Sequence, residues 1–201
     1  LLTGRFGNED IATATAEKLT MDTNAHLRLK AALYLGTNGL TCIAELAGDA
    51  AAPIDVRITA IQTVGARHIK APELLAELVN DPLEPIQLAA ITAVGANRHA
   101  QVLPALETLA LTAKPVVAVG IASAVRELRT AKGEDVLLTL LDHDHTDVKI
   151  AAAKGLALVG SASAVEALSP YTGGGLFADG DLTNATVDAV AQIQARLGDV
   201  E

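Results

Sequence analysis

The chain has 201 residues, half of them apolar, and a formal net charge of −9 at pH 7. Only 2% of its residues are aromatic and none is tryptophan, so the core must be built from aliphatic side chains. A net negative charge repels phosphate backbones, which argues against general nucleic-acid binding and favours a basic protein or peptide as partner. One cysteine excludes an intrachain disulfide, and no apolar run reaches the roughly 18 residues that a membrane span needs.

The beginning of the chain lacks the charged and then apolar segment of a secretory signal peptide. Together with the single cysteine, this predicts a cytoplasmic protein. The cysteine, Cys42, lies in the apolar segment LTCIAEL, where we expect it to be buried. The chain does not begin with methionine, so an excised domain of a longer protein is one hypothesis.

The first predicted element is a helix over residues 9–19, with the sequence EDIATATAEKL. We interpret it as the second helix of a truncated repeat, which occupies residues 1–22. From residue 27 onward, one helical pattern recurs six times at intervals of 29 to 34 residues. In each copy, positions 1, 5, 6 and 9 form a helical stripe rather than a strand alternation.

The six copies share a branched aliphatic residue at position 1 and, with one threonine, a small residue at position 5. A small residue at that point predicts a close crossing with a neighbouring helix. The first positions are Leu27, Val56, Ile86, Val116, Val148 and Leu182. The fifth positions are Ala31, Ala60, Ala90, Gly120, Ala152 and Thr186.

Second helical segments lie between these helices, over residues 40–47, 72–79, 101–111, 134–141 and 162–168. One pair of about 30 residues cannot bury its apolar face alone, so the pairs must stack. The sequence therefore predicts an all-α fold, an α-solenoid of about six stacked helix pairs in a single domain. Residues 23–169 would hold four to five repeats, and residues 170–201 a capping turn and helix. Tyr171 and Phe177 are expected to cover the end of the solenoid.

The segment DVKIAAAKGLALVG, residues 147–160, is similar to the first helix of a HEAT repeat, of the short type in bacterial phycobilisome lyases. Residues 55–65 and 27–36 also match that pattern of valine or leucine, a basic residue, alanines and glycine. The resemblance covers almost the whole chain and implies a HEAT-like superhelix in a bacterial protein. It indicates little about function, because the repeated residues are packing residues.

Two further expectations concern the first helices. Glycine follows the ninth position at Gly36, Gly65 and Gly95, where a positive φ can end a helix. The resemblance also implies a ladder of basic residues at position 2. This ladder is present at Arg28, Arg57 and Lys149 and is expected to be interrupted at Gln87, Val117 and Thr183.

The segment DHDHTD, residues 142–147, looks like a metal site because it combines two histidines with three aspartates. It also resembles the His-x-His-x-Asp-His signature of metallo-β-lactamase-type hydrolases. However, the last histidine of that signature would fall on Val148, the preceding segment has helical periodicity, and no histidine follows His145. We therefore predict a polar turn before a first helix, and no metal, cofactor or catalytic site.

The second helices are biased toward acidic residues, which predicts an acidic concave face for a protein or peptide with a basic surface. This acidic row consists of Glu45, Glu73, Glu77, Glu107 and Asp135. Glu45, Glu77 and Glu107 are expected at equivalent positions of successive repeats; ordinary solvated helix positions are the alternative interpretation. The turns inside the repeats carry a basic ridge, a secondary site for an acidic partner. This basic ridge consists of Arg67, Lys70, Arg98, Arg129 and Lys132.

The sequence favours a non-catalytic protein-binding scaffold or adaptor module. The main alternative, implied by the family resemblance alone, is an accessory or lyase-type function on a chromophore-carrying protein. A structural spacer within a longer chain is a third hypothesis. The residues do not identify the partner or the oligomeric state.

Overall fold

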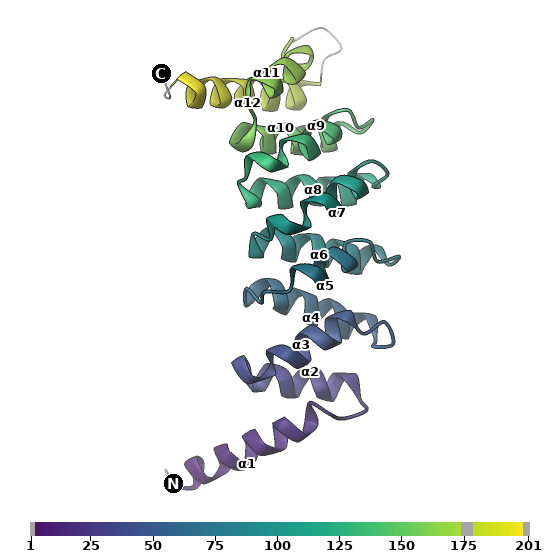
Figure 1. Ribbon diagram of the computed structural model, residues 1–201, viewed down its shortest axis with the longest axis vertical. Coiled ribbons are helices and arrows are strands. Elements are labelled where there is room, and N and C mark those ends of the chain that lie inside the picture. Colours follow the sequence, from purple (N-terminus) through teal and green to yellow (C-terminus); the bar gives the residue numbers. More distant parts are fainter. Residues whose placement is uncertain (1–2, 174–178, 199–201) are drawn as a thin grey trace.

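The computed structural model describes residues 3–173 and 179–198, which form one stack of α-helices (Figure 1). Five helix pairs make up the stack, and one further helix lies at each end. No strand and no helix long and apolar enough to cross a membrane occurs within these ranges. The predicted α-solenoid of stacked helix pairs is therefore confirmed. Phe177 lies outside the described residues.

The pairs combine a longer first helix with a shorter second helix. The first helices are α2 (Ala25–Tyr34), α4 (Ile54–Ala66), α6 (Glu84–Asn97), α8 (Pro115–Leu128) and α10 (Thr146–Val159). The second helices are α3 (Leu40–Gly48), α5 (Pro72–Leu78), α7 (Leu103–Ala110), α9 (Glu134–Leu141) and α11 (Ala162–Leu168). The terminal helices are α1 (Thr3–Leu19) and α12 (Gly180–Gly198). Four short 3-10 helices are also present: η1 (Gly36–Gly39), η2 (Ala100–Val102), η3 (Ala131–Gly133) and η4 (Ser169–Tyr171).

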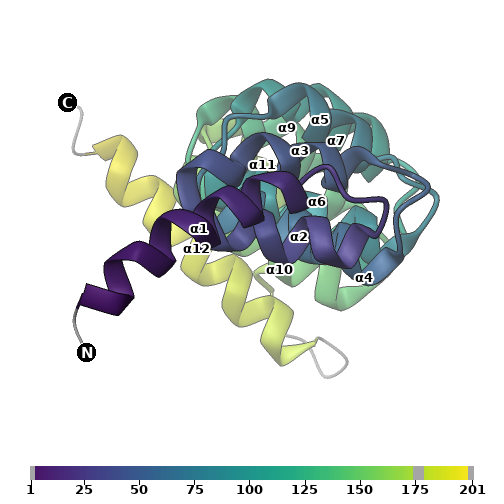
Figure 2. The same cartoon turned by 90° about the horizontal axis from the view of Figure 1, so that it is seen from below.

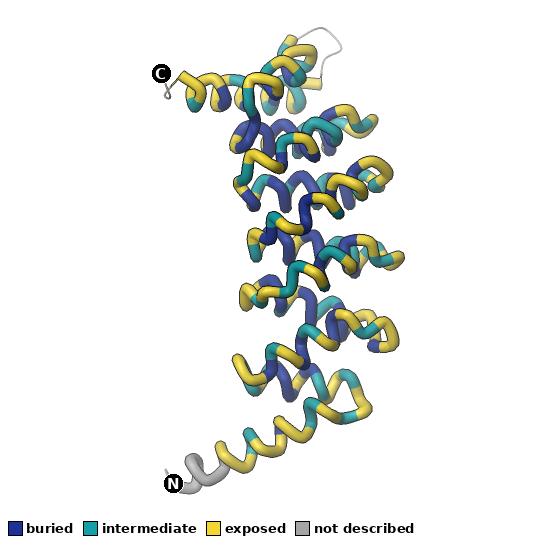
Figure 3. The backbone as a smooth tube through the Cα atoms, in the orientation of Figure 1, coloured by how far each residue is buried: buried dark blue, intermediate teal, exposed yellow. Residues whose placement is uncertain are grey.

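Successive first helices from α4 to α12 pack directly on one another and form the continuous layer of the stack. The predicted small residues lie in this layer, where Ala60, Ala90 and Ala152 are fully buried. Figure 3 shows the buried residues concentrated along these helices. Small side chains thus permit the close helix crossings that the sequence predicted.

The three glycines expected to end first helices have different roles. Gly36 adopts a positive φ of 59° directly after α2, as predicted. Gly65 and Gly95 lie within α4 and α6, so the prediction is wrong for them. A β-carbon at Gly65 would lie only 3.1 Å from Cα of Ala93, and one at Gly95 only 3.0 Å from Cα of Ala124. These glycines therefore serve close packing between first helices rather than helix termination.

The fourth repeat begins one residue later than predicted. Val116 is 61% exposed, whereas Val117 is buried. The buried stripe of α8 consequently runs through Val117, Ile121 and Val125, which have the spacing of successive helical turns. Two adjacent valines fit the repeat pattern equally well in sequence, and only their packing distinguishes them.

Side chains at position 2 of the first helices cap the preceding second helix. Arg57 is 4% exposed, and its Nε donates to the carbonyl of Ala47 near the end of α3 over 3.4 Å. Its Nη2 forms an ion pair of 2.6 Å with Asp81. The last carbonyls of a helix lack intrahelical hydrogen-bond partners. A donor in this position satisfies carbonyls that would otherwise be buried without a hydrogen bond.

A neutral residue makes the same kind of capping bond at one position where the ladder of basic residues is interrupted. Nε2 of Gln87 donates to the carbonyl of Val79 over 2.8 Å, at the end of α5. An amide N–H satisfies a carbonyl as a cation does, so the capping bond is kept at Gln87 although the basic residue is lost. Lys149 completes the pattern by donating to Leu141 at the end of α9 over 3.2 Å.

The two terminal helices extend past the same edge of the stack. This edge carries the turns inside the repeats, whereas the turns between repeats lie along the opposite edge (Figure 1). The view from below shows the same projection of α1 and α12 (Figure 2). Arg196 fixes α12 on the stack, because its guanidinium donates to the carbonyls of Ala157, over 2.7 Å, and Gly160.

The helix crossing can be tested by overpacking it. We expect Ala90→Leu to lower the free energy of unfolding by about 1–3 kcal/mol, because a larger side chain must separate α6 from its neighbours. Thr92→Leu, on the exposed side of the same helix, is the matched control and should change stability by less than about 0.5 kcal/mol. Urea unfolding followed by circular dichroism measures the stability of both variants. If Ala90→Leu is as stable as the wild-type chain, Ala90 does not lie at a close helix crossing.

Candidate partner-binding surfaces

The second helices carry only negative charge. The helices α3, α5, α7, α9 and α11 contain no lysine or arginine, whereas the first helices taken together contain residues of both signs. Their carboxylates are Glu45, Glu73, Glu77, Glu107, Glu134, Asp135 and Glu166. Because they come from consecutive repeats, they form a row along one broad side of the stack, which we call the second-helix face.

All five residues of the predicted acidic row are exposed on this face. Glu45 is the one with an ion-pair partner among the described residues, because its Oε2 lies 3.1 Å from Nη2 of Arg28. Glu73, Glu77, Glu107 and Asp135 form no ion pair with any residue that the structure describes. Their charges are therefore available to a partner.

Two further carboxylates of this face are absent from the acidic row that the sequence predicted. Glu134 has a structural role, since its Oε1 accepts hydrogen bonds from N of Ser161 over 3.0 Å and from Oγ over 2.7 Å. Glu166 is exposed on α11 and extends the acidic row by one repeat. Glu166 could have been predicted from the sequence, because the five second helices α3 to α11 all lack basic residues.

The acidic residues do not share one strict register. Glu77 lies two residues after the buried Leu75 and directly before the buried Leu78, and Glu45 has equivalent buried neighbours. Glu107 instead follows the buried Leu106 directly. One residue rotates a side chain by roughly 100° around the helix axis, so the predicted equivalence of Glu107 is wrong. The row is an irregular band rather than a straight line.

The sequence predicted that the second helices line a concave face. In Figure 1 the outline of the stack is hollowed at another place, the edge with the turns inside the repeats, because α1 and α12 project beyond it. The basic ridge lies along this edge. Its five residues Arg67, Lys70, Arg98, Arg129 and Lys132 are all exposed.

Arg67 differs from the other residues of the basic ridge. Its guanidinium donates to the carbonyls of Gly36 over 3.1 Å and Leu33 over 3.3 Å, which caps the end of α2. The other four residues form no ion pair with any described residue. Arg98 and Arg129 also adopt the left-handed backbone conformation, with φ of 52° and 49°, which is uncommon for residues other than glycine.

An open groove of about 600 Å³ lies on the basic ridge between the second and third repeats. Lys70 and Arg98 supply cations to its lining, which also includes His68 and His99. Asn97 anchors the groove, because its amide donates to the carbonyls of Val64 over 3.2 Å and Ile69 over 3.1 Å. A concave, cationic surface of this kind suits an acidic side chain.

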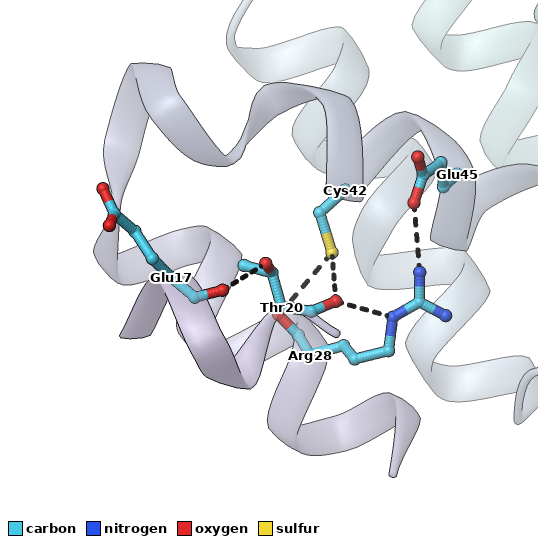
Figure 4. Close-up of polar contacts among 5 residues, drawn as sticks. All are labelled: Glu17, Thr20, Arg28, Cys42 and Glu45. Carbon is cyan, nitrogen blue, oxygen red and sulfur yellow. Dashed lines mark hydrogen bonds and ion pairs between the residues drawn. The ribbon is translucent and has the colours of Figure 1, made fainter. Parts of the chain in front are cut away.

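Cys42 is buried, and Figure 4 shows its thiol directed toward backbone oxygens of Thr20 and Arg28. Its Sγ lies 3.7 Å from the carbonyl oxygen of Thr20 and 4.0 Å from that of Arg28. Burial raises the pKa of the Cys42 thiol above its ordinary value, and the nearby Arg28 opposes this rise only in part. A reactive cysteine needs a lowered pKa, so this environment favours packing over nucleophilic chemistry.

The first four residues of the DHDHTD segment, 142–145, form the turn between α9 and α10, as predicted, and Thr146 and Asp147 begin α10. Nδ1 of His143 accepts a hydrogen bond of 3.1 Å from the backbone N–H of His145, and the two rings lie 5.4 Å apart. Across residues 3–173 and 179–198, no three His, Cys, Asp or Glu side chains are grouped as metal ligands. His143 is therefore used locally to order the turn.

Three solved structures have an architecture similar to that of this chain. An engineered protein is 17% identical to this chain, covering 91% of it and 96% of the engineered protein, with a TM-score of 0.64. The complex of CpcE and CpcF of phycocyanin lyase from Nostoc sp. PCC7120 is 18% identical, with coverages of 87% and 74% and a TM-score of 0.57. A designed armadillo repeat protein is 16% identical, with coverages of 90% and 92% and a TM-score of 0.56.

The fold is a HEAT-type helical-repeat solenoid. At these identities the likeness establishes the fold alone. No family model matches the chain. No curated protein matches it either.

The environment of Cys42 predicts a slow thiol. We expect native protein to react with 5,5′-dithiobis(2-nitrobenzoate) at least about tenfold more slowly than protein unfolded in guanidinium, because burial limits both access and thiolate formation. The matched control is Cys42→Ala/Met21→Cys, because Met21 is 89% exposed. Its thiol should react at nearly the same rate in both states. Equal rates for wild-type protein in both states would show that Cys42 is accessible and reactive.

Proposed function

We propose that this chain is a non-catalytic scaffold that binds a basic, extended protein segment along the second-helix face. The observation that supports this proposal is the charge segregation: five consecutive second helices hold carboxylates and no basic residue. A segment with several lysines or arginines would meet a carboxylate at each repeat. Such pairs orient the partner and accelerate its association more than they raise affinity.

Each exposed charge pair contributes little, so the proposed binding depends on repetition. A solvent-exposed pair stabilises by about 0.2–1 kcal/mol. Several pairs, presented by helices with fixed spacing, add up to measurable affinity when the partner is extended. The attraction is screened by salt, because all the residues involved are exposed. A scaffold of this kind would release its partner as ionic strength rises.

The binding face can be tested by charge reversal with a matched net charge. The probe is a fluorescein-labelled peptide of alternating lysine and serine, measured by fluorescence anisotropy at low and moderate salt. We expect Glu77→Lys/Glu107→Lys to weaken binding by about tenfold or more, since two attractions become repulsions. Asp142→Lys/Asp144→Lys, in an exposed turn between repeats, is the control. Both variants shift the formal charge from −9 to −5, because each reversal adds two units.

If the control substitutions weaken peptide binding by less than about threefold, the result supports recognition by the second-helix face. Equal losses in both variants would show that the peptide responds only to net charge. Circular dichroism of each variant verifies that the helices remain folded. If the wild-type chain does not bind the lysine peptide at low salt, the proposal is wrong.

The basic ridge supports a second candidate function, binding of an acidic segment at the turn edge. It rests on the groove around Lys70 and Arg98, whose cations have no ion-pair partner among the described residues. We expect Lys70→Glu/Arg98→Glu to abolish binding of a glutamate–serine peptide while leaving binding of the lysine–serine peptide intact. Loss of both would indicate a folding defect, and loss of neither would exclude the ridge.

A lyase-type function on a chromophore-carrying protein remains the alternative proposal. Its support is the fold-level likeness to the phycocyanin lyase complex, and a fold does not determine chemistry. The buried and weakly acidic thiol of Cys42 does not favour covalent catalysis. Chromophore transfer would move visible absorbance onto a partner, whereas a scaffold would leave any chromophore where it was.

A further inference from the structure

Apart from Val116, which lies outside the buried stripe of α8, two aliphatic residues of the repeat pattern are exposed, and they lie at opposite ends of the stack. Leu27 occupies position 1 of α2 and is 39% exposed, whereas Val56 at the same position of α4 is fully buried. Val187 occupies position 6 of α12 and is 46% exposed, whereas Ile61 at that position of α4 is fully buried. Both ends therefore present a first-helix surface that no described helix covers.

An open apolar groove of about 450 Å³ lies between α1 and α2. Its lining includes Ala12, Ala16 and Leu19 of α1 and Leu27, Ala31 and Tyr34 of α2. In the repeat pattern α1 is a second helix, and it packs against α2 as α5 packs against α6. The groove lies where the first helix belonging to α1 would complete a pair, and Figure 3 shows that much of α1 is exposed there.

At the opposite end of the stack, a first helix lacks its second helix. In the repeat pattern α12 is a first helix, and it packs on α10 as α10 packs on α8. Among the described residues, no second helix accompanies it. Val187, Ala191 and Ala195 recur every four residues on α12 and are all exposed, so they form one apolar strip. In α6 the residue equivalent to Val187 is Ile91, which is fully buried. It lies next to the following first helix, since a β-carbon added at Gly120 of α8 would be 3.8 Å from its Cγ2.

From these surfaces we propose that copies of this chain associate head to tail, with α12 of one copy seated in the groove between α1 and α2 of the next. The free first helix and the free second helix would then form one complete pair, and the layer of first helices would continue across the contact. Charge supports this occupant, because Lys30 borders the groove and Asp188 borders the strip of α12. The inference is independent of the proposed peptide binding, since neither surface includes a carboxylate of the second helices.

A contact between two different surfaces does not close after two copies. Each added copy leaves one groove and one α12 strip free, so association continues into longer, open assemblies. This property separates the proposed contact from a symmetric dimer, which would stop at two copies. It also allows each surface to be blocked separately.

The test uses two end-blocked variants of this 201-residue chain. Ala191→Arg blocks the strip of α12, and Tyr34→Arg blocks the groove; Tyr34 is 59% exposed and Ala191 is exposed, so both substitutions are compatible with folding. Sedimentation velocity of the wild-type chain should show a series of species that lengthens with concentration. Each variant alone should be monomeric, with association weakened by at least about tenfold. An equimolar mixture should form dimers and nothing larger, because only one intact groove and one intact strip can meet.

Three results would overturn the proposal. The wild-type chain could remain monomeric at every concentration, which would mean that the groove takes another occupant. It could form only a dimer that survives both substitutions, which would place the contact elsewhere. Or the mixed variants could fail to form a dimer although circular dichroism shows that both are folded. Loss of peptide binding in the charge-reversal variants would affect none of these readouts.

Discussion

Close packing between successive first helices is the constraint on which the rest of this structure depends. At Gly65 and Gly95 a single added methyl group would lie about 3 Å from a backbone atom of the next helix. The first helices therefore cannot slide or tilt without a clash. Because each second helix is joined to its first helix by a short turn, the spacing of the first helices also sets the spacing of the second helices. The acidic band on the second-helix face inherits that spacing.

Polar groups reinforce the same layer from its ends. Arg67, Asn97 and Arg196 each donate from one first helix to carbonyls at the end of the preceding one. Arg57, Gln87 and Lys149 donate from a first helix to the preceding second helix. These bonds satisfy carbonyls that the helices leave free, and each bond links neighbouring repeats. The stack thus gains its continuity from contacts between adjacent repeats, as expected for a solenoid.

Two sets of exposed charges lie on separate surfaces. The acidic row and Glu166 lie on the second-helix face, while the basic ridge lies on the turn edge, past which the helices α1 and α12 project. A chain with a net charge of −9 therefore still offers a cationic surface. Two separated surfaces of opposite sign suit a scaffold that holds partners in a defined orientation.

Sequence periodicity was sufficient to predict the helix pairs and the small residues at their crossings, since both follow from the spacing of apolar residues. It was insufficient where a local choice depends on packing. Val116 and Val117 fit the pattern equally, and only burial selects Val117. Gly65 carries the signature of a helix end, yet the approach of Ala93 is what requires glycine. Arg67 looked like a free cation, but its position across from α2 commits it to a cap. The exposed acidic residues were predicted because exposure and charge are properties of sequence pattern, whereas the rotation of Glu107 around its helix depends on how α7 packs.

The most direct measurement of the central claim is an NMR titration of the wild-type chain with the lysine–serine peptide. Backbone amide shifts report where the peptide lies without any substitution. If the peptide binds along the second-helix face, the largest changes will occur in α5, α7 and α9, around Glu77, Glu107 and Asp135, and they will decrease as salt is added. Changes centred on the first helices, or spread evenly over every exposed carboxylate, would contradict a binding role for the second-helix face.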